Sequence, residues 1–260
     1  PIEPDCIWAF GESGFQGADE GKERVIGPSG QHTVYEQQSG NKELTTVIVS
    51  ICADGETALP AVIFKGKGYR TDCLGYSAKG WTDREMGVLW IKHFNEHTQA
   101  KANGRARLLL VDGHASHYTR GFFEYARAHN IHVLCYPSHS THIYQGLNVV
   151  IFSRLKACWA NEKAQWQWDH GEELSKQNFL AIYGRAHNRA LTPELVKAAF
   201  WKTGMHPFNP DVVTDEVMAP SQETSCLAHL PVVQTSPVHV VSQLIRRITE
   251  PAPSSDPDAM

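Results

Sequence analysis

The sequence lacks an excess of positive charge, paired cysteines and any long hydrophobic run. Its 260 residues include 24 Lys and Arg against 28 Asp and Glu, a formal net charge of −4, so the overall charge gives no support to nucleic-acid binding. The six cysteines show no CxxC pair and no regular spacing, which predicts buried free thiols in a reducing compartment. No apolar run approaches the ~18 residues of a membrane span and no signal-peptide pattern is present, so we expect no membrane partner.

What the chain does have is the composition of a globular protein, 42% hydrophobic and 20% charged. Its length fits one domain with an extension. The sequence begins at Pro1 and enters a strand almost at once, so we expect that a further N-terminal portion precedes it. After Asn209-Pro210, prolines punctuate a polar stretch. This composition predicts a largely disordered tail over 211–260, with one short helix near 240–248.

Hydrophobic patterning predicts an α/β fold. An apolar run at 107–111, a helix at 119–129 and a strand at 131–136 form a strand–helix–strand unit, whose two strands should be parallel. The turn Ala53-Asp54-Gly55 joins two further strands into a hairpin. Helix signals include Thr192 as an N-cap, followed by Pro193 and Glu194. In full, we expect strands at 7–10, 45–52 and 59–64, loops at 11–30 and 66–80, and helices at 86–102, from 148, at 174–190 and from 193 to near 204.

The run from Leu108 to Val111 ends in Asp112, Gly113 and His114. A buried strand that carries an Asp at its C-terminal tip is typical of α/β proteins that present a metal ligand or an acid to a cleft. A strand-end Asp can also cap the next turn through backbone N–H groups. Taken alone, the motif leaves both interpretations open.

Three segments together resemble a known family. They are IWAFGESGF at 7–15, LLLVDGHASH at 108–117 and PSHSTHIYQGLNV at 137–149, and further support comes from 38–45, 52–67, 79–83 and 202–210. The combination resembles the DDE superfamily endonuclease domain of pogo, Tigger and jerky transposases, which includes domesticated relatives such as centromere protein B. The resemblance covers roughly residues 1–210 and is closest to the forms common in fungal genomes.

The resemblance implies a ribonuclease H-like mixed sheet flanked by helices, with its core at 1–163 and a C-terminal helical part at 164–210. The family uses three carboxylates to hold two Mg²⁺ or Mn²⁺ ions for phosphodiester cleavage, and such ions prefer oxygen ligands. The resemblance also implies DNA as a partner and a nuclear location. It places a helix-turn-helix region in the missing N-terminal part, and it is compatible with a homo-oligomer.

The chain departs from the family at two of the three acid positions. The family's first Asp is replaced by Gly11, with Glu12 beside it as a candidate substitute, and its third is replaced by Asn148; Asp112 is kept. Gly146 also replaces a family Pro. Asp112 and Asn148 remain as metal ligands, the second through a neutral amide oxygen. Disturbing even an outer partner of a metal site costs ~10–100-fold in affinity or activity, so we expect catalysis to be lost or weak.

Two other functions stay open at this stage. One is an active endonuclease with a rearranged set of acids, drawn from Glu12, Asp19, Asp112 and Glu162. The other is a non-enzymatic protein-interaction scaffold, which the negative net charge favours.

Several further residues each allow a functional and a plainer interpretation. His114 and His117 would line the cleft or lie in a partly buried loop. His139 and His142 would form a zinc pair or a structural turn. The cations of the 65–70 segment would contact a DNA backbone or lie in a solvated loop. A tryptophan set would form a stacking platform or pack between helices. The cations are Lys65, Lys67 and Arg70, and the tryptophans are Trp159, Trp166 and Trp168.

Overall fold

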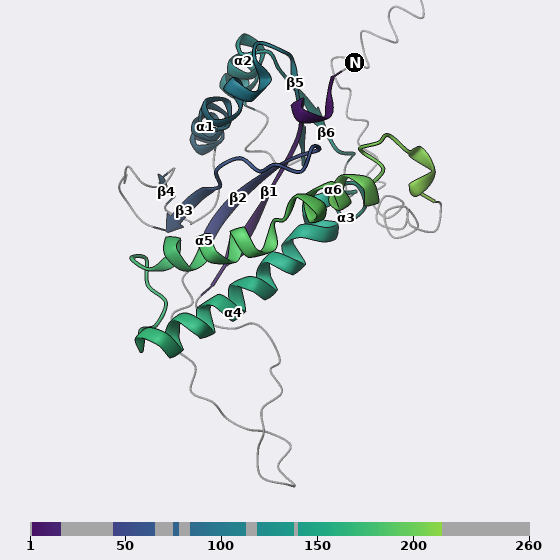
Figure 1. Ribbon diagram of the computed structural model, residues 1–260. Coiled ribbons are helices and arrows are strands. Elements are labelled where there is room, and N and C mark those ends of the chain that lie inside the picture. The colour runs from purple at the N-terminus through teal and green to yellow at the C-terminus, as the bar shows by residue number, and fades with distance from the viewer. Residues whose placement is uncertain are drawn as a thin grey trace, which may run out of the picture. The chain divides into compact units, whose positions relative to one another are not determined.

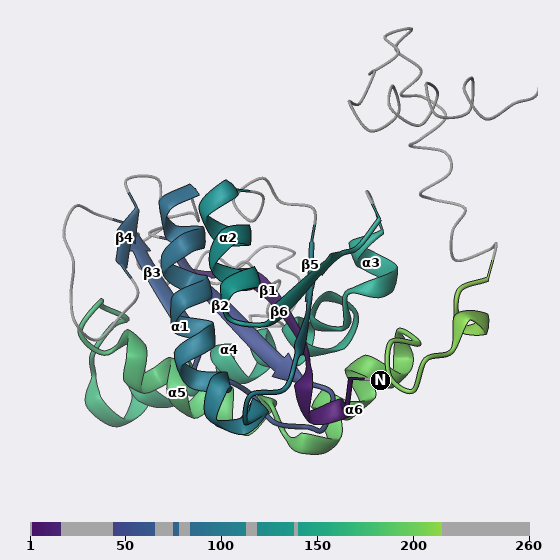
Figure 2. The same ribbon diagram turned by 90° about the horizontal axis from the view of Figure 1, so that it is seen from above.

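The computed structural model describes residues 2–16, 44–65, 75–77, 84–112, 119–137 and 140–214. Within these ranges the chain forms a mixed sheet with helices on both faces (Figures 1 and 2). The elements in chain order are η1 Pro4–Cys6, β1 Ile7–Phe15, β2 Thr45–Cys52, β3 Ala61–Lys65, β4 Gly75–Ser77, α1 Arg84–Ala102, β5 Arg107–Val111, α2 Arg120–Ala128, β6 Ile131–Cys135, α3 Thr141–Tyr144, the π-helical turn η3 Leu147–Ile151, α4 Phe152–His170, α5 Phe179–Ala190, α6 Pro193–Lys202 and η4 Pro210–Val212.

The six strands follow the order β4-β3-β2-β1-β5-β6. The long strand β1 pairs antiparallel with β2 and parallel with β5. β5 and β6 are parallel, which confirms the predicted strand–helix–strand unit, and the antiparallel pairing of β2 with β3 confirms the predicted hairpin. At α6, Thr192 accepts from the backbone N–H of Leu195, so the predicted N-cap is also confirmed.

Three predicted boundaries were wrong. The first strand does not end at Phe10, because its backbone pairing with β2 continues to Phe15. This pairing holds glycine and polar residues in the strand although their own preference for strands is weak. The predicted loop at 66–80 contains β4, which pairs with β3. α5 begins at Phe179 rather than 174, because the side chain of Asn178 hydrogen-bonds to backbone groups of residues 173 and 175 and holds a turn there.

The hydrophobic core has two halves, one on each face of the sheet. Because side chains alternate along a strand, Trp8 and Phe10 of β1 pack with α1 and α2, and Ala9 packs with the helices on the other side. That second half is built from α4, α5 and α6 (Figure 2). The residues that carry the candidate site belong to this second face.

The cysteines in the described part of the chain are free thiols, as predicted. Cys6, Cys52 and Cys158 are buried, and Cys135 is half-buried. Burial raises the pKa of the Cys52 thiol to about 12. A thiol with so high a pKa stays protonated and unreactive at neutral pH.

Candidate active site

The first two acid positions of the resemblance meet where β1 runs beside β5. Ala9 of β1 is level with Leu110 of β5. From this last paired position, Gly11 lies two residues further along β1, and Asp112 lies two residues further along the neighbouring chain segment, just past the end of β5 at Val111. The fold therefore brings together two positions that lie about a hundred residues apart in the sequence.

A third residue extends this row into β6. Val111 is level with Cys135, and the next step sets Asp112 beside Tyr136, whose backbone N–H donates to the Val111 carbonyl at 2.9 Å. Tyr136 is only 6% exposed. Burial, together with the nearby Asp112 charge, raises the pKa of its hydroxyl. Within the described part of the chain this hydroxyl has no hydrogen-bond partner.

The third acid position, Asn148, is connected to β1 through the buried side-chain amide of Gln145. Gln145 donates from Nε2 to the carbonyl oxygen of Phe10 at 3.1 Å. Its Oε1 accepts a short hydrogen bond from Nδ2 of Asn148. Gln145 therefore links Asn148, at the start of the π-helical turn η3, to the strand that carries Gly11. Single π-helical turns of this kind are frequent at functional sites.

Two glycines allow this close packing. A Cβ placed on Gly11 would lie 2.8 Å from Nε2 of Gln145 and 3.2 Å from the ring of Phe152. A Cβ on Gly146 would lie 2.7 Å from the backbone oxygen of Ala199 in α6. The 2.8 Å and 2.7 Å distances are shorter than real Cβ contacts, so a neighbouring atom would have to shift to make room for either side chain. At both positions where glycine replaces the family residue, the chain is therefore closely packed: Gly11 lies against Gln145 and Phe152, and Gly146 lies against α6.

The candidate substitute acids lie elsewhere. Glu12 is level with Ile48 of β2, which belongs to the core half under α1 and α2, so the strand turns it away from the face of Gly11. Glu162 is ten residues into α4, about 15 Å along the helix axis, and pairs with Arg189 at 3.1 Å. Asp19 lies outside the described residues.

The remaining candidates take different positions. Trp159 is buried in the core, Trp166 stacks on His170, and Trp168 is 87% exposed. His142 and Lys65 are exposed. Five further candidates lie outside the described residues: His114, His117 and His139, with the cations Lys67 and Arg70. Among the residues that the structure does describe, no group of three or more His, Cys, Asp or Glu side chains could hold a metal ion.

Sequence reasoning missed the roles of Gln145 and Tyr136. Tyr136 was within reach, because it follows β6 by one residue just as Asp112 follows β5, and parallel strands end at the same edge of a sheet. The bridging role of Gln145 had no such signal. Its hydrogen bond to Phe10 spans 135 residues of sequence and depends on how α6 and η3 pack.

Comparison with known families decides the classification. The family model described as "DDE superfamily endonuclease" matches residues 41–200. The chain belongs to this family. The predicted assignment to the DDE superfamily is therefore confirmed.

Solved structures place this DDE domain in the same fold as Mos1 transposase. The catalytic domain of Mos1 mariner transposase superposes with a TM-score of 0.50 at 12% identity, over 76% of this chain and 77% of that one. The Mos1 strand transfer complex gives a TM-score of 0.54 at 13% identity, over 78% of this chain and 52% of that one. The predicted ribonuclease H-like fold is confirmed. This DDE domain spans about half the length of the Mos1 chain in that complex.

A curated relative in sequence is "MFS-type transporter clz9" of Cochliobolus lunatus. It is 31% identical over 241 residues, which cover 88% of this chain and 26% of that protein. That name describes the whole protein, of which this DDE domain corresponds to about a quarter. In the ranges that the structure describes, no helix has the length and apolarity needed to span a membrane.

Proposed function

We propose that this transposase-derived DDE domain binds DNA and has lost most or all of the two-metal cleavage chemistry of its family. Within that family we assign it to the pogo, Tigger and jerky group, on the motifs at 7–15, 108–117 and 137–149. A nuclear location follows from the same assignment. Sequence-specific DNA recognition would belong to a helix-turn-helix segment outside this chain.

The observation that carries the loss of cleavage is the chemistry of the residues in the row. Two-metal cleavage needs one ion to activate a water and a second to stabilise the leaving oxygen, and carboxylates supply the charge that holds both. Here Gly11 offers no ligand. Asn148 offers a neutral amide that is already bound to Gln145, and Asp112 is the single carboxylate of the three positions. These residues do not fit a pair of divalent ions.

Support for DNA as the partner comes from the structural neighbours. They include Mos1 transposase in a paired-end complex with the left transposon end and in a paired-end complex with Mn. These descriptions concern Mos1, and we extend them to this chain as a proposal. The net charge of −4 predicts that binding by this domain alone is weak.

A plasmid-nicking assay tests the proposal. Purified protein and its Asp112→Ala variant are incubated with supercoiled DNA and either Mg²⁺ or Mn²⁺. We expect both to give the same background of nicked circles, because no metal pair forms at the row. Nicking that requires a divalent ion and disappears in Asp112→Ala would instead support an active site with a rearranged acid set.

A second candidate function, a protein-interaction scaffold, is favoured by the negative net charge. Fluorescence anisotropy with labelled duplex DNA at several salt concentrations separates the two. DNA binding predicts an affinity that falls steeply as salt rises, because each phosphate contact releases counterions. A scaffold predicts no measurable binding at low salt.

A further inference from the structure

The last strand of the sheet, β6, has one edge that no other strand pairs with in the described part of the chain. Its bonds to β5 show which way its backbone groups point. The carbonyl of Asn130 accepts from Arg107, and the N–H of Tyr136 donates to Val111. Backbone groups alternate in direction along a strand, so the odd-numbered residues between these two point away from β5. The residues with outward-pointing N–H and C=O groups are Ile131, Val133 and Cys135.

The sequence of β6 carries none of the usual protection of a sheet edge. Proteins commonly protect an edge strand with a charged side chain, a proline or a bulge. The strand Ile131–Cys135 contains no Lys, Arg, Asp, Glu or Pro, and it pairs with β5 in regular register along its whole length. Leu134, on this strand, is 55% exposed. The edge is therefore open to another extended backbone.

A pocket of about 310 Å³ lies between α2 and β6. The consecutive strand residues Ile131, His132 and Val133 line it. Neighbouring side chains of a strand point to opposite faces, so a pocket that touches all three reaches the backbone as well as the side chains. The wall on α2 includes Phe123, which is 38% exposed, and Arg127. A strand laid beside β6 would place alternate side chains in this pocket.

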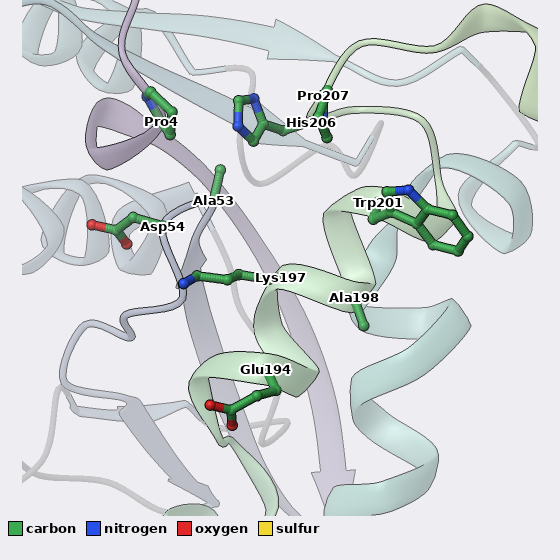
Figure 3. Close-up of a pocket in the computed structure, with 9 residues that line it drawn as sticks. All are labelled: Pro4, Ala53, Asp54, Glu194, Lys197, Ala198, Trp201, His206 and Pro207. Carbon is green, nitrogen blue, oxygen red and sulfur yellow. The ribbon is translucent and has the colours of Figure 1, made fainter.

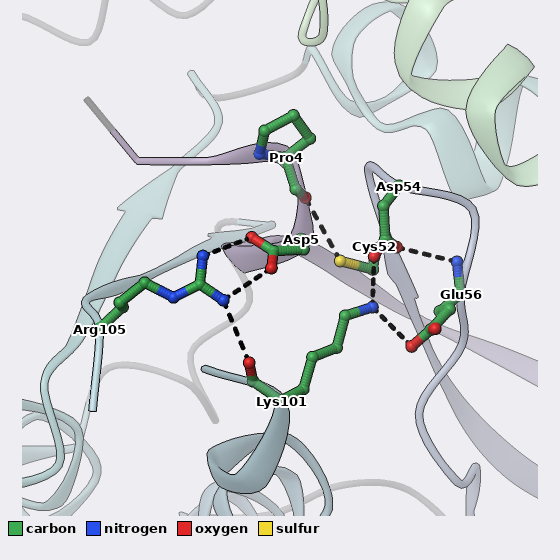
Figure 4. A network of polar contacts seen from close by, with 7 residues as sticks. All are labelled: Pro4, Asp5, Cys52, Asp54, Glu56, Lys101 and Arg105. Carbon is green, nitrogen blue, oxygen red and sulfur yellow. Dashed lines mark hydrogen bonds and ion pairs between the residues drawn. The ribbon is translucent and has the colours of Figure 1, made fainter. Parts of the chain in front are cut away.

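Two arginines hold this part of the sheet in place. Arg107 is buried and donates to the carbonyl of His129, in the turn between α2 and β6, at 2.8 Å, and to the hydroxyl of Thr98 in α1 at 2.7 Å. Arg105, just before β5, donates to both carboxylate oxygens of Asp5 at 3.0 and 2.6 Å and so ties β5 to η1 (Figure 4). Because the edge is already ordered, the ordering cost of binding falls mainly on the partner.

The charge beside this edge is positive. Arg127 is exposed, and it alone among the residues lining the pocket carries a permanent charge. Within the described ranges it forms no ion pair, and Glu124, one turn earlier on α2, pairs with Arg120 at 2.6 Å. On the other face of β6, Leu134 presents an apolar side chain to water. A strand that complements both faces therefore alternates acidic and apolar side chains.

We propose that the free edge of β6 binds an extended peptide segment of a partner protein, in which acidic and apolar residues alternate. The peptide backbone pairs with the outward groups of β6, its acidic side chains face Arg127, and its apolar side chains cover Leu134. In such strand addition the backbone bonds supply affinity and the alternate side chains select the partner. The proposal does not depend on DNA binding or on the loss of cleavage, because no residue of the candidate active site lines the pocket.

Hydrogen exchange followed by NMR on the full chain tests the pairing. The probe is a seven-residue peptide of alternating valine and glutamate with blocked ends. At saturation it should slow exchange of the Val133 and Cys135 amides at least about tenfold. The same peptide methylated on every backbone nitrogen keeps its side chains and should not bind. Equal binding of both peptides, no binding of either, or amides that exchange slowly without peptide, because the chain or a second copy already covers the edge, overturns the proposal.

Variants of the two faces test the side-chain contacts. Arg127→Glu should weaken binding of the valine–glutamate peptide about tenfold and favour a peptide with lysine in place of glutamate. Leu134→Glu should also weaken binding about tenfold. Leu59→Glu is the matched control, because Leu59, between β2 and β3, is a similarly exposed leucine at 59%. Thermal melting confirms that each variant folds. Binding indifferent to both Arg127→Glu and Leu134→Glu contradicts the proposal.

A second apolar surface provides a test of location. It is a groove of about 590 Å³ beside α6, lined in part by Pro4, Trp201 and Pro207 (Figure 3). Trp201 is 69% exposed, and exposed aromatic side chains often bind peptides. Trp201→Ala should leave the affinity for the valine–glutamate peptide unchanged. Affinity lost in Trp201→Ala but kept in Leu134→Glu would place the peptide in this groove and overturn the assignment to β6.

Discussion

Replacing Gly11 by Asp will destabilise the fold by about 2–4 kcal/mol and will not produce a DNA-cleaving enzyme. The new Cβ would lie 2.8 Å from Nε2 of Gln145 and 3.2 Å from the ring of Phe152. Gln145 must then give up its hydrogen bonds to Phe10 and Asn148. The added carboxylate also enters a buried strand without a cation to balance it. Restoring the family's first acid therefore costs stability before it can contribute any chemistry.

Urea unfolding measures the effect of Gly11→Asp. Gly184→Asp is the control, because a Cβ on Gly184 meets nothing within 4 Å and the substitution should stay within about 0.5 kcal/mol of wild type. A double-mutant cycle with Gln145→Ala isolates the cause. Without the Gln145 side chain, Gly11→Asp should cost at least about 1 kcal/mol less. Equal costs in both backgrounds would show that the close contact at Gln145 is not the reason.

Acidification will unfold the protein in part through one histidine, His187 of α5. It is 7% exposed, and burial lowers its pKa to about 4, against about 6.5 in an unfolded chain. Between these pH values the unfolded chain binds a proton that the folded one rejects, so stability falls as the pH drops from 6.5 toward 4. This difference in pKa between the folded and the unfolded chain corresponds to about 3 kcal/mol at most.

Unfolding free energies at several pH values from 7.5 to 4.5 check this expectation. His187→Gln keeps a hydrogen-bond acceptor near the Tyr183 hydroxyl, which lies 3.2 Å from the histidine ring nitrogen, and it removes the titration. The variant should lose less stability than the wild type below pH 6.5. His132→Gln, at an exposed position on β6, should leave the pH dependence unchanged. Parallel curves for the wild type and His187→Gln would contradict the account.

The sequence predicted those parts of the fold that depend on local patterns. The apolar run before Asp112, the helix after it and the strand ending at Cys135 formed the expected parallel unit. The Thr192 cap fixed the start of α6. The second half of β1 escaped prediction, because the stretch from Gly11 to Gly14 has weak strand preference and is held by its pairing with β2.

The candidate site divides in the same way. Motif positions alone located Gly11, Asp112 and Asn148, since their spacing along the chain follows the family. Which side chains pack between these three positions depends on contacts between segments that are distant in the sequence. A Cβ at Gly11 would press on the amide of Gln145, and a Cβ at Gly146 would press on the backbone of Ala199 in α6. No periodicity in the sequence reports such contacts.

Titration of Mn²⁺ into the full chain by calorimetry, with Asp112→Ala as the control, tests the central claim most directly. We expect no heat of binding that depends on Asp112, because one carboxylate and one engaged amide cannot hold a divalent pair. Binding that is clear in the wild type and lost in Asp112→Ala would contradict the account, since other acids would then have replaced the two missing ones.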